Sequence, residues 1–336
     1  MGHGSYKASD WAKLKESRGI AASSSAGQLF SRKSMLDKFN PKFIQMRESC
    51  DSEDSPESTP IIIGFDVTGS MGYLAAEIAK NALNETIVNI YNKKPVTNPH
   101  IMCAAIGDVC DQAPLQVTQF EADIRVVEQL LDLWLEGAGG DYPENFNLLW
   151  YFADKHTKID SYINRNKKGF LFTIGDAETH PNLSALSISK IFGDQSQDLD
   201  NQQLLQAVSE KYEVFHIVVR DTRAIAHWNS IIPGRVAYLS AENISNLSAV
   251  ITSIMQIANG MSKQDAIGQW PAKTNAAVAQ AVETIHLDKV QPKPSLKPKV
   301  KAEVEAPAKP EPVAKVEVPA KPIAKERTFL SKLFNK

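Results

Sequence analysis

Oxygen-bearing side chains gather in three short segments of this sequence. Asp66-Val67-Thr68-Gly69-Ser70 supplies one carboxylate and two hydroxyls. Gly139-Gly140-Asp141-Tyr142-Pro143-Glu144 and Gly175-Asp176-Ala177-Glu178 supply further carboxylates. Hard cations such as Mg²⁺ take oxygen ligands in octahedral geometry and usually keep some of their waters. Two hydroxyls with only a few carboxylates would hold such an ion and leave it with residual positive charge, which attracts a carboxylate from another molecule.

Alternating strands and helices in the middle of the chain would bring these segments together. Residues 61–65 form a continuous apolar run, which is typical of a strand buried on both faces. Further strands are expected at 101–106, 115–120, 169–174, 214–219 and 235–239, with helices near 74–90, 124–135, 146–152, 201–211 and 243–259. This order predicts an α/β fold: a mostly parallel six-stranded sheet with one antiparallel hairpin strand and helices on both faces. Ligands of such sheets bind at the carboxyl ends of the strands, where two of the three segments lie.

The first segment resembles the Asp-x-Ser-x-Ser signature of von Willebrand factor A (vWA) domains, with Thr68 in place of the middle serine. In that family the signature opens a metal-ion-dependent adhesion site at the top of a Rossmann-like sheet. The order of predicted elements is similar over about residues 60–260. The resemblance implies a Rossmann-like vWA fold and a bound Mg²⁺, with Mn²⁺ or Ca²⁺ as alternatives. The implied metal ligands are Asp66, Thr68, Ser70, Glu144 and Asp176.

The second segment supports this ligand set through another resemblance. Asp141-Tyr142-Pro143-Glu144 is similar to the Asp-x-Pro-Glu loop of integrin β-type A domains, where the Glu is a direct ligand and the Asp helps a neighbouring metal. Most vWA domains have a Thr where Asp141 follows the glycine pair, so Glu144 would compensate for a missing ligand. The likeness is closer to bacterial and protist A domains of the α-kinase type, which also have an Asp-x-x-Asp turn. Here that turn is Asp108-Val109-Cys110-Asp111, so Asp108 and Asp141 are candidates for an outer shell or a second metal.

The ends of the chain have a different composition from its middle. Residues 291–336 carry a net charge of +6 and 8 of the 18 prolines, whereas the preceding residues carry −8. We expect an arm at 1–59 that is partly helical or disordered, a helical extension at 261–289 and a Pro/Lys/Ala-rich linker at 290–326. Residues 327–336 place four large apolar side chains on one helical face and are expected to dock on a second protein, a membrane surface or their own domain. These side chains are Phe329, Leu330, Leu333 and Phe334.

Charge and cysteine content restrict the location and the partners. The whole chain of 336 residues has a net charge of −2, without the basic excess of a general nucleic-acid binder, so no nucleic-acid partner is expected. Its three cysteines are too few for a disulfide scaffold, and the N-terminal residues lack an apolar signal region. We therefore expect a cytoplasmic protein.

These observations predict a non-catalytic interaction module. It would act as an intracellular assembly adaptor that binds an Asp or Glu of a partner protein through its metal. One alternative is a Mg²⁺-dependent phosphotransferase or phosphatase of the haloacid-dehalogenase type with Asp66 as nucleophile, because the first segment also resembles the Asp-Lys-Thr-Gly-Thr loop of phosphate-transferring pumps. The other is a metal-free scaffold, whose site is present but empty, as Thr68 and the missing loop Thr would allow. For single residues the alternatives are that Thr68 or Ser70 caps the following helix and that Glu144 is a first-turn residue favoured by the helix dipole.

Overall fold

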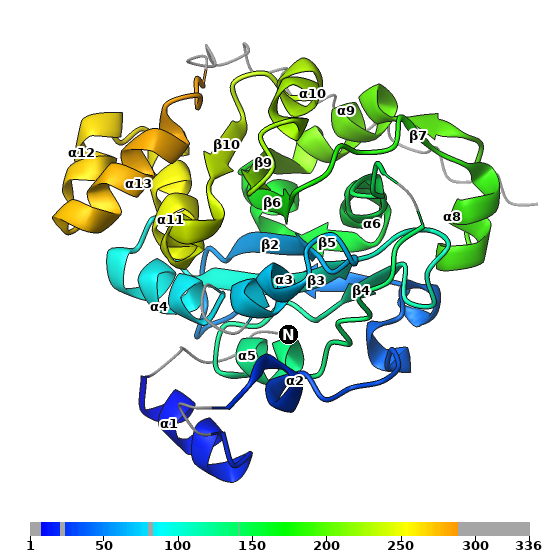
Figure 1. Cartoon of the computed structure of the whole chain (residues 1–336), viewed down its shortest axis with the longest axis horizontal. Helices are drawn as coiled ribbons and strands as arrows, with labels where there is room; N and C mark the ends of the chain where they lie inside the picture. The colour runs from blue at the N-terminus through cyan, green and yellow to red at the C-terminus, as the bar shows by residue number, and fades with distance from the viewer. Residues whose placement is uncertain (1–7, 21–23, 80–82, 141, 288–336) are drawn as a thin grey trace, which may run out of the picture. The chain divides into compact units, whose positions relative to one another are not determined.

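A six-stranded sheet forms the centre of the computed structural model, which describes residues 8–20, 24–79, 83–140 and 142–287 (Figure 1). The strands stand in the order β10-β9-β6-β2-β3-β4, and only β4 runs antiparallel to its neighbour. Their bounds are β2 (Thr59–Asp66), β3 (Pro99–Ile106), β4 (Leu115–Val117), β6 (Gly169–Gly175), β9 (Tyr212–Val219) and β10 (Val236–Leu239). The predicted α/β fold with a mostly parallel sheet and one antiparallel edge strand is confirmed.

Helices cover both faces of the sheet because alternate residues of each strand point to opposite faces. Ile61 and Ile63 of β2 join one apolar cluster, and Ile62 between them joins the other. The first cluster includes residues of α3 (Tyr73–Glu77), α4 (Leu83–Lys93), α5 (Arg125–Leu130), α11 (Leu247–Ala258) and α13 (Ala272–Val282). The second includes residues of α6 (Asn147–Lys155), α8 (Ala185–Phe192), α9 (Asn201–Lys211) and α10 (Ala224–Ile231).

Gly64 allows helix α6 to approach the middle of β2. A Cβ at this position would stand 2.2 Å from Leu149 Cδ2 of α6 and 2.9 Å from Ile106 Cδ1 of β3. A side chain there would have to displace the ends of the Leu149 and Ile106 side chains. Since Glu144 lies just before α6, this contact helps to place Glu144 relative to the end of β2.

Several short elements were not expected from the sequence. Helices α7 (Asp160–Arg165), α8 and α10 fall in regions with no predicted helix, and the described residues of the region where one helix was expected, near 74–90, include α3 and α4. The helix expected near 243–259 begins as a 3₁₀ segment, η4 (Ala241–Asn246). Two small pairs lie outside the main sheet, β1 (Arg47–Ser49) with β5 (Thr157–Ile159) and β7 (Asn182–Leu183) with β8 (Leu199–Asp200).

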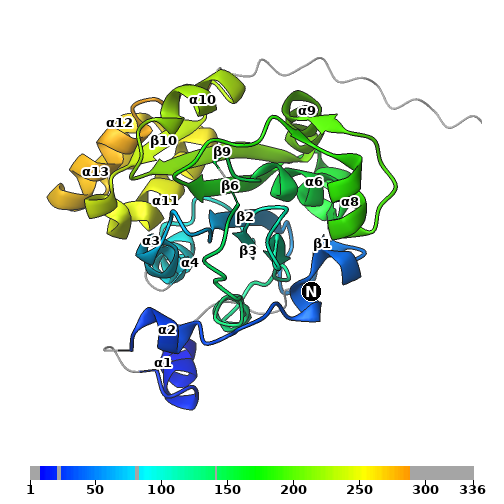
Figure 2. The same cartoon turned by 45° about the vertical axis from the view of Figure 1, so that its right-hand side comes forward.

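The chain divides into two units, Met1–Lys289 and Val290–Lys336. In the first unit the C-terminal helices α12 (Lys263–Gly268) and α13 pack beside α11 (Figure 2), and Val278 and Val282 are fully buried. The second unit, with the predicted linker and Phe329, Leu330, Leu333 and Phe334, lies outside the described residues. No described helix combines the length and apolar character that crossing a membrane requires.

The N-terminal arm is tied to the first unit by apolar and ionic contacts. Its described part folds into α1 (Ala8–Ser17), α2 (Ala26–Leu29), the 3₁₀ turns η1 (Asp37–Phe39) and η2 (Pro41–Phe43), and β1. Phe30 and Phe39 are buried in the first apolar cluster. Three arm cations, Arg18, Arg32 and Lys38, converge on the carboxylate of Asp132 at 3.5, 3.0 and 3.0 Å.

An Asp132→Asn substitution is expected to loosen the arm because one carboxylate, only 15% exposed, serves all three cations. We expect a loss of roughly 1 kcal/mol of stability, as for a small network of partly exposed ion pairs. Faster tryptic cleavage after Arg32 would measure the release. Asp123→Asn is the matched control, since Asp123 pairs with Arg125 two residues away rather than with the arm. Equal cleavage of the two variants would contradict the prediction.

Candidate metal site

The first predicted segment lies at the carboxyl end of the central strand. Asp66 is the last residue of β2 and is completely buried, while Gly69 and Ser70 are exposed at the turn that leads to α3. The turn is held in place by Val67 N, which donates to Ile106 O at 2.9 Å, and by Gly69 N, which donates to Ala138 O at 2.5 Å. A buried carboxylate thus lies four residues before an exposed serine in the same turn.

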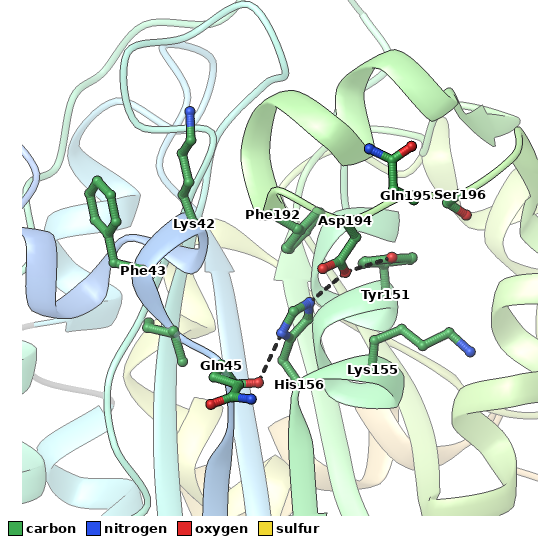
Figure 3. Close-up of a pocket in the computed structure, with 11 residues that line it drawn as sticks. Lys42, Phe43, Gln45, Tyr151, Lys155, His156, Phe192, Asp194, Gln195 and Ser196 are labelled. Carbon is green, nitrogen blue, oxygen red and sulfur yellow. Dashed lines mark hydrogen bonds and ion pairs between the residues drawn. The ribbon is translucent and has the colours of Figure 1, made fainter. Parts of the chain in front are cut away.

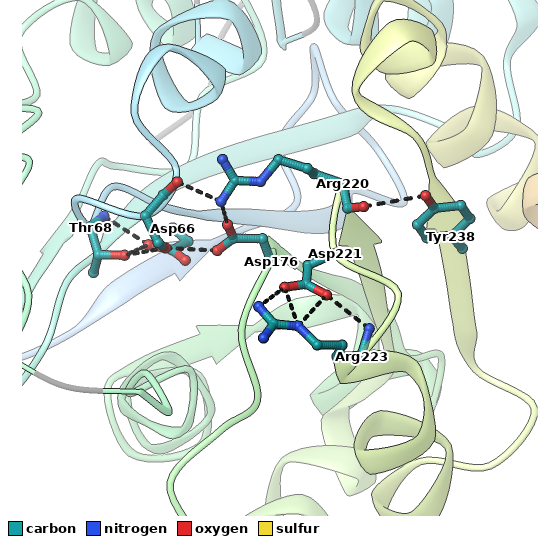
Figure 4. Close-up of polar contacts among 8 residues, drawn as sticks. Asp66, Thr68, Asp176, Arg220, Asp221, Arg223 and Tyr238 are labelled. Atoms are coloured by element: carbon teal, nitrogen blue, oxygen red, sulfur yellow. Dashed lines mark hydrogen bonds and ion pairs between the residues drawn. The ribbon is translucent and has the colours of Figure 1, made fainter.

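A chain of hydrogen bonds links four of the five predicted ligands (Figure 4). Thr68 donates to Asp66 Oδ1 from its backbone N at 2.8 Å and from its Oγ1 at 2.7 Å. Thr68 Oγ1 lies 3.4 Å from Ser70 Oγ, and Ser70 Oγ donates to Asp176 Oδ1 at 2.8 Å. The structure therefore brings the carboxyl ends of β2 and β6 together, as the sequence predicted.

Glu144 joins this group from a separate loop. Its backbone N donates to Glu178 O at 2.9 Å, and its O accepts from His180 N at 3.0 Å, so the two loops pair like short strands. Gly139, with a φ of 121°, passes so close that a Cβ there would stand 3.2 Å from Thr68 Cβ and 3.5 Å from Glu144 Oε1. A glycine is needed at this position both for the backbone angle and for the approach.

Burial makes the two inner carboxylates hard to ionise. It raises the pKa of Asp66 to about 7, and the charges of Asp176 and Asp111 add to the effect while the bonds from Thr68 oppose it. It raises the pKa of Glu144 to about 9, with the charge of Asp66 as the next cause. Asp66 Oδ2 and Glu144 Oε2 are buried and have no hydrogen-bond partner among the described residues. A bound cation would remove both penalties, because it would pair with the carboxylates as ions.

The donor set fits a hard cation only when the hydroxyls are included. Within the described residues no group of three or more His, Cys, Asp or Glu side chains is arranged to hold a metal ion. Asp66 and Glu144 supply two carboxylates, and Thr68 and Ser70 supply hydroxyl oxygens at the same place. Oxygen donors of this kind, completed by water, are those that Mg²⁺ accepts. The residues present therefore fit Mg²⁺. Asp176 would support this set from outside, because its Oδ1 accepts the hydrogen bond of Ser70 Oγ.

The Asp108 turn supports the glycine loop. Asp111 Oδ1 accepts from Gly139 N at 2.9 Å, and Asp111 Oδ2 accepts from Asp108 N at 2.8 Å. Asp108 Oδ1 accepts from Cys110 N at 2.9 Å, and its Oδ2 lies 3.5 Å from His180 Nε2. These contacts give Asp108 a structural role: it stabilises the turn whose Asp111 holds the glycine loop before Glu144. Asp141, the other candidate for a second metal, lies outside the described residues.

Arg220 is a part of this site that the sequence reasoning missed. Its Nη2 forms an ion pair with Asp176 Oδ2 and donates to Ser70 O at 2.7 Å (Figure 4). Arg220 is the first residue after β9, the neighbour of β6 in the sheet. Its position directly after a strand could have indicated that it lies near the site. A positively charged side chain is not a metal ligand, however, so it was not among the candidates.

A second concavity lies between η2 and α8, with a volume of about 570 Å³ (Figure 3). Its central histidine is already fully bonded: His156 Nε2 lies 2.8 Å from Asp194 Oδ2 and Nδ1 lies 3.2 Å from Gln45 O. The ring is also stacked between Phe152 and Phe192. His156 therefore joins the arm to the loop after α8, and we assign it a structural role.

Comparisons with known proteins give similarities of structure alone. No protein-family model matches the sequence, and no curated protein matches it. Among solved structures, the pilus adhesin SpaC of Lactobacillus rhamnosus GG in its open conformation is 9% identical, with a TM-score of 0.40 over 62% of this chain and 31% of the adhesin. A von Willebrand factor type A protein of Catenulispora acidiphila is 10% identical, with a TM-score of 0.37 over 61% of this chain and 43% of that protein.

A third structure, the conserved hypothetical protein BatB of Bacteroides thetaiotaomicron, is 12% identical, with a TM-score of 0.35 over 60% of this chain and 98% of BatB. This chain thus spans less than half of the length of SpaC and of the Catenulispora protein. These are distant similarities of structure, one of them to a von Willebrand factor type A protein.

Proposed function

We propose that this chain is a non-catalytic protein-interaction module, acting in the cytoplasm, whose candidate metal site holds Mg²⁺ and captures a carboxylate of a partner protein. The observation that carries the proposal is the pair of buried, unpartnered oxygens, Asp66 Oδ2 and Glu144 Oε2, beside two hydroxyls. Buried carboxylates are seldom left without a partner, and a cation is the partner that satisfies both at once.

The residues would divide the task by their exposure. Asp66, Thr68 and Glu144 are buried and would hold the ion from below, while Ser70 lies at the exposed turn. When bound, Mg²⁺ would supply a positive charge that accepts one further oxygen ligand. Asp176 would keep the Ser70 hydroxyl oriented through the 2.8 Å hydrogen bond. A partner would therefore approach from the side of Ser70.

The phosphotransfer alternative receives less support from the geometry. A nucleophilic aspartate must present an oxygen to a phosphorus atom. Asp66 is completely buried, and its Oδ1 accepts two hydrogen bonds from Thr68. The other oxygen, Oδ2, has no partner among the described residues but is also buried, so it is more accessible to a small ion than to a phosphoryl group.

The metal-free scaffold is the second candidate, and Arg220 is the observation that favours it. The guanidinium already neutralises Asp176, so one of the carboxylates has a cation without any metal. In this case the surface around Ser70 would bind its partner through direct hydrogen bonds. The two candidates differ in one measurable property, which is the dependence of partner binding on a divalent ion.

Capture of a partner from cells of the source organism is expected to require Mg²⁺. Immobilised full-length protein would be incubated with extract in Mg²⁺ or in EDTA, and the retained proteins identified by mass spectrometry. A specific partner should be lost in EDTA and lost with Ser70→Ala. The control is Ser189→Ala, at an exposed serine of α8. Retention that is equal in Mg²⁺ and EDTA would favour the scaffold.

A second contact is proposed for the C-terminal segment. Phe329, Leu330, Leu333 and Phe334 would bind another protein or a membrane surface at the end of the Pro-rich linker. Two weak contacts joined by a linker strengthen each other through effective concentration. This arrangement would make the chain an assembly adaptor.

A further inference from the structure

We propose that Arg220 is the resident cation of the candidate metal site and that it lowers the site's affinity for divalent metal. This inference rests on the proposed function, since it concerns the regulation of the same site. In the absence of metal the guanidinium would hold Asp176 and the Ser70 turn in place. A divalent ion would then have to bind beside an existing positive charge.

The contacts of Arg220 show that it serves the metal-binding turn directly. One nitrogen, Nη2, pairs with Asp176 Oδ2 and also donates to Ser70 O at 2.7 Å. Asp176 Oδ1 accepts from Ser70 Oγ, so both oxygens of this carboxylate are engaged. The Asp176 side chain is only 3% exposed, and Arg220 is its one ion-pair partner among the described residues. Arg220 thus connects the loops after β2 and β6.

The backbone places Arg220 with little freedom. Its N donates to Leu239 O at 3.0 Å, and its O accepts from Tyr238 Oη at 3.3 Å. Its φ of 62° is uncommon for a residue other than glycine. A left-handed conformation directly after a strand is therefore maintained by hydrogen bonds to β10. Such local constraint is expected where a side chain must point in a defined direction.

Charge balance indicates the effect on metal affinity. Ionised Asp66 and Glu144 offer two negative charges to a divalent ion, and Arg220 already compensates the charge of Asp176. The guanidinium therefore adds a positive charge next to the place of the ion. This charge weakens the attraction that draws the ion in, because like charges repel strongly where the carboxylates are shielded from water.

Arg223 provides a matched control in the same loop. Within the described part of the chain its side chain pairs with Asp221 alone, and it is 81% exposed, compared with 42% for Arg220. Removing the charge of Arg223 changes the net charge of the protein by the same amount but leaves Ser70 and Asp176 untouched. A difference between the two arginines would therefore come from the contacts and not from overall charge.

The test measures Mn²⁺ binding to metal-stripped full-length protein by electron paramagnetic resonance, for the unmodified chain, Arg220→Gln and Arg223→Gln. Arg220→Gln is expected to bind Mn²⁺ about tenfold more tightly, and Arg223→Gln to bind as the unmodified chain does. Thermal unfolding gives a second readout. Metal-free Arg220→Gln should unfold at a lower temperature than the unmodified chain, and saturating Mn²⁺ should remove that deficit.

Three outcomes would separate the inference from the proposed function. Binding by the unmodified chain with equal or weaker binding by Arg220→Gln would overturn the inference and leave the proposed function intact. Weaker binding in particular would make Arg220 a positioning residue for Asp176. Absence of Mn²⁺ binding by all three proteins would overturn the proposed function, and the inference with it.

Discussion

Replacing Asp66 and Ser70 together by alanine is expected to abolish saturable binding of Mg²⁺ and Mn²⁺. The substitution removes one buried carboxylate and the hydroxyl that connects Thr68 to Asp176. Loss of a supporting partner of a metal ligand alone typically weakens affinity by about 10–100-fold, so the loss of two candidate ligands should exceed that. Calorimetric titration of metal-stripped protein would measure the effect.

The control for this double substitution is Asp221→Asn. Asp221 lies in the loop after β9 and pairs with Arg223, so its loss removes a nearby negative charge without touching the proposed ligands. It should bind metal like the unmodified chain. Metal binding that survives in the double variant would place the ion elsewhere in the protein.

The stability of the metal-free protein is expected to fall as the pH rises from about 4 to about 7. Burial raises the pKa of Asp66 from 3.8 to about 7 and that of Glu144 from 4.5 to about 9. In this range the native state therefore binds more protons than the unfolded state, and the free energy of unfolding decreases with pH. The stability that these two carboxyl groups contribute is fully present below their unfolded pKa values. It is lost as the pH rises through their pKa values in the folded protein.

The loss from Asp66 alone is on the order of 4 kcal/mol, at about 1.4 kcal/mol for each unit of pKa. Urea unfolding in EDTA at a series of pH values from 4 to 8 would measure it. Asp66→Asn should lack this part of the decrease between pH 4 and pH 8, and saturating Mg²⁺ should restore the stability of the unmodified chain at high pH. A metal-free protein whose stability rises steadily over this range would contradict the prediction.

Most strands of the main sheet could be predicted from the sequence because they are long enough to show a pattern, whereas β4 has only three residues of the strand expected at 115–120. The run at 61–65 reads as a strand buried on both faces, and β2 has that burial. The strands of β1, β5, β7 and β8 have only two or three residues, so no periodicity is visible. Helix α8 did have a local signal, because Ser184 accepts from Ser187 N as its N-cap. That serine was not used in the prediction.

The candidate site was predicted in part for a similar reason. Asp66, Thr68 and Ser70 occupy alternate positions of one five-residue segment, and Asp176 directly follows a recognisable strand, so local patterns locate them. Arg220 pairs with Asp176 across 44 residues, and no local pattern records an ion pair of that kind. The small cavity beside Thr68, of about 260 Å³, likewise depends on a distant segment, since Gly27 and Phe30 of the arm form one of its walls. Contacts between remote segments require the folded chain.

The separation of these segments also has a consequence for the order of events in synthesis. Ser70 and Arg220 stand 150 residues apart, and β6, which Asp176 directly follows, lies between β2 and β9 in the sheet. A chain that grows from its N-terminus presents the Asp66 turn long before β9 leaves the ribosome. Nascent chains would hold an incomplete cluster of carboxylates without Arg220. Release of β9 and β10 would then mark the moment at which the surface around Ser70 becomes competent for assembly.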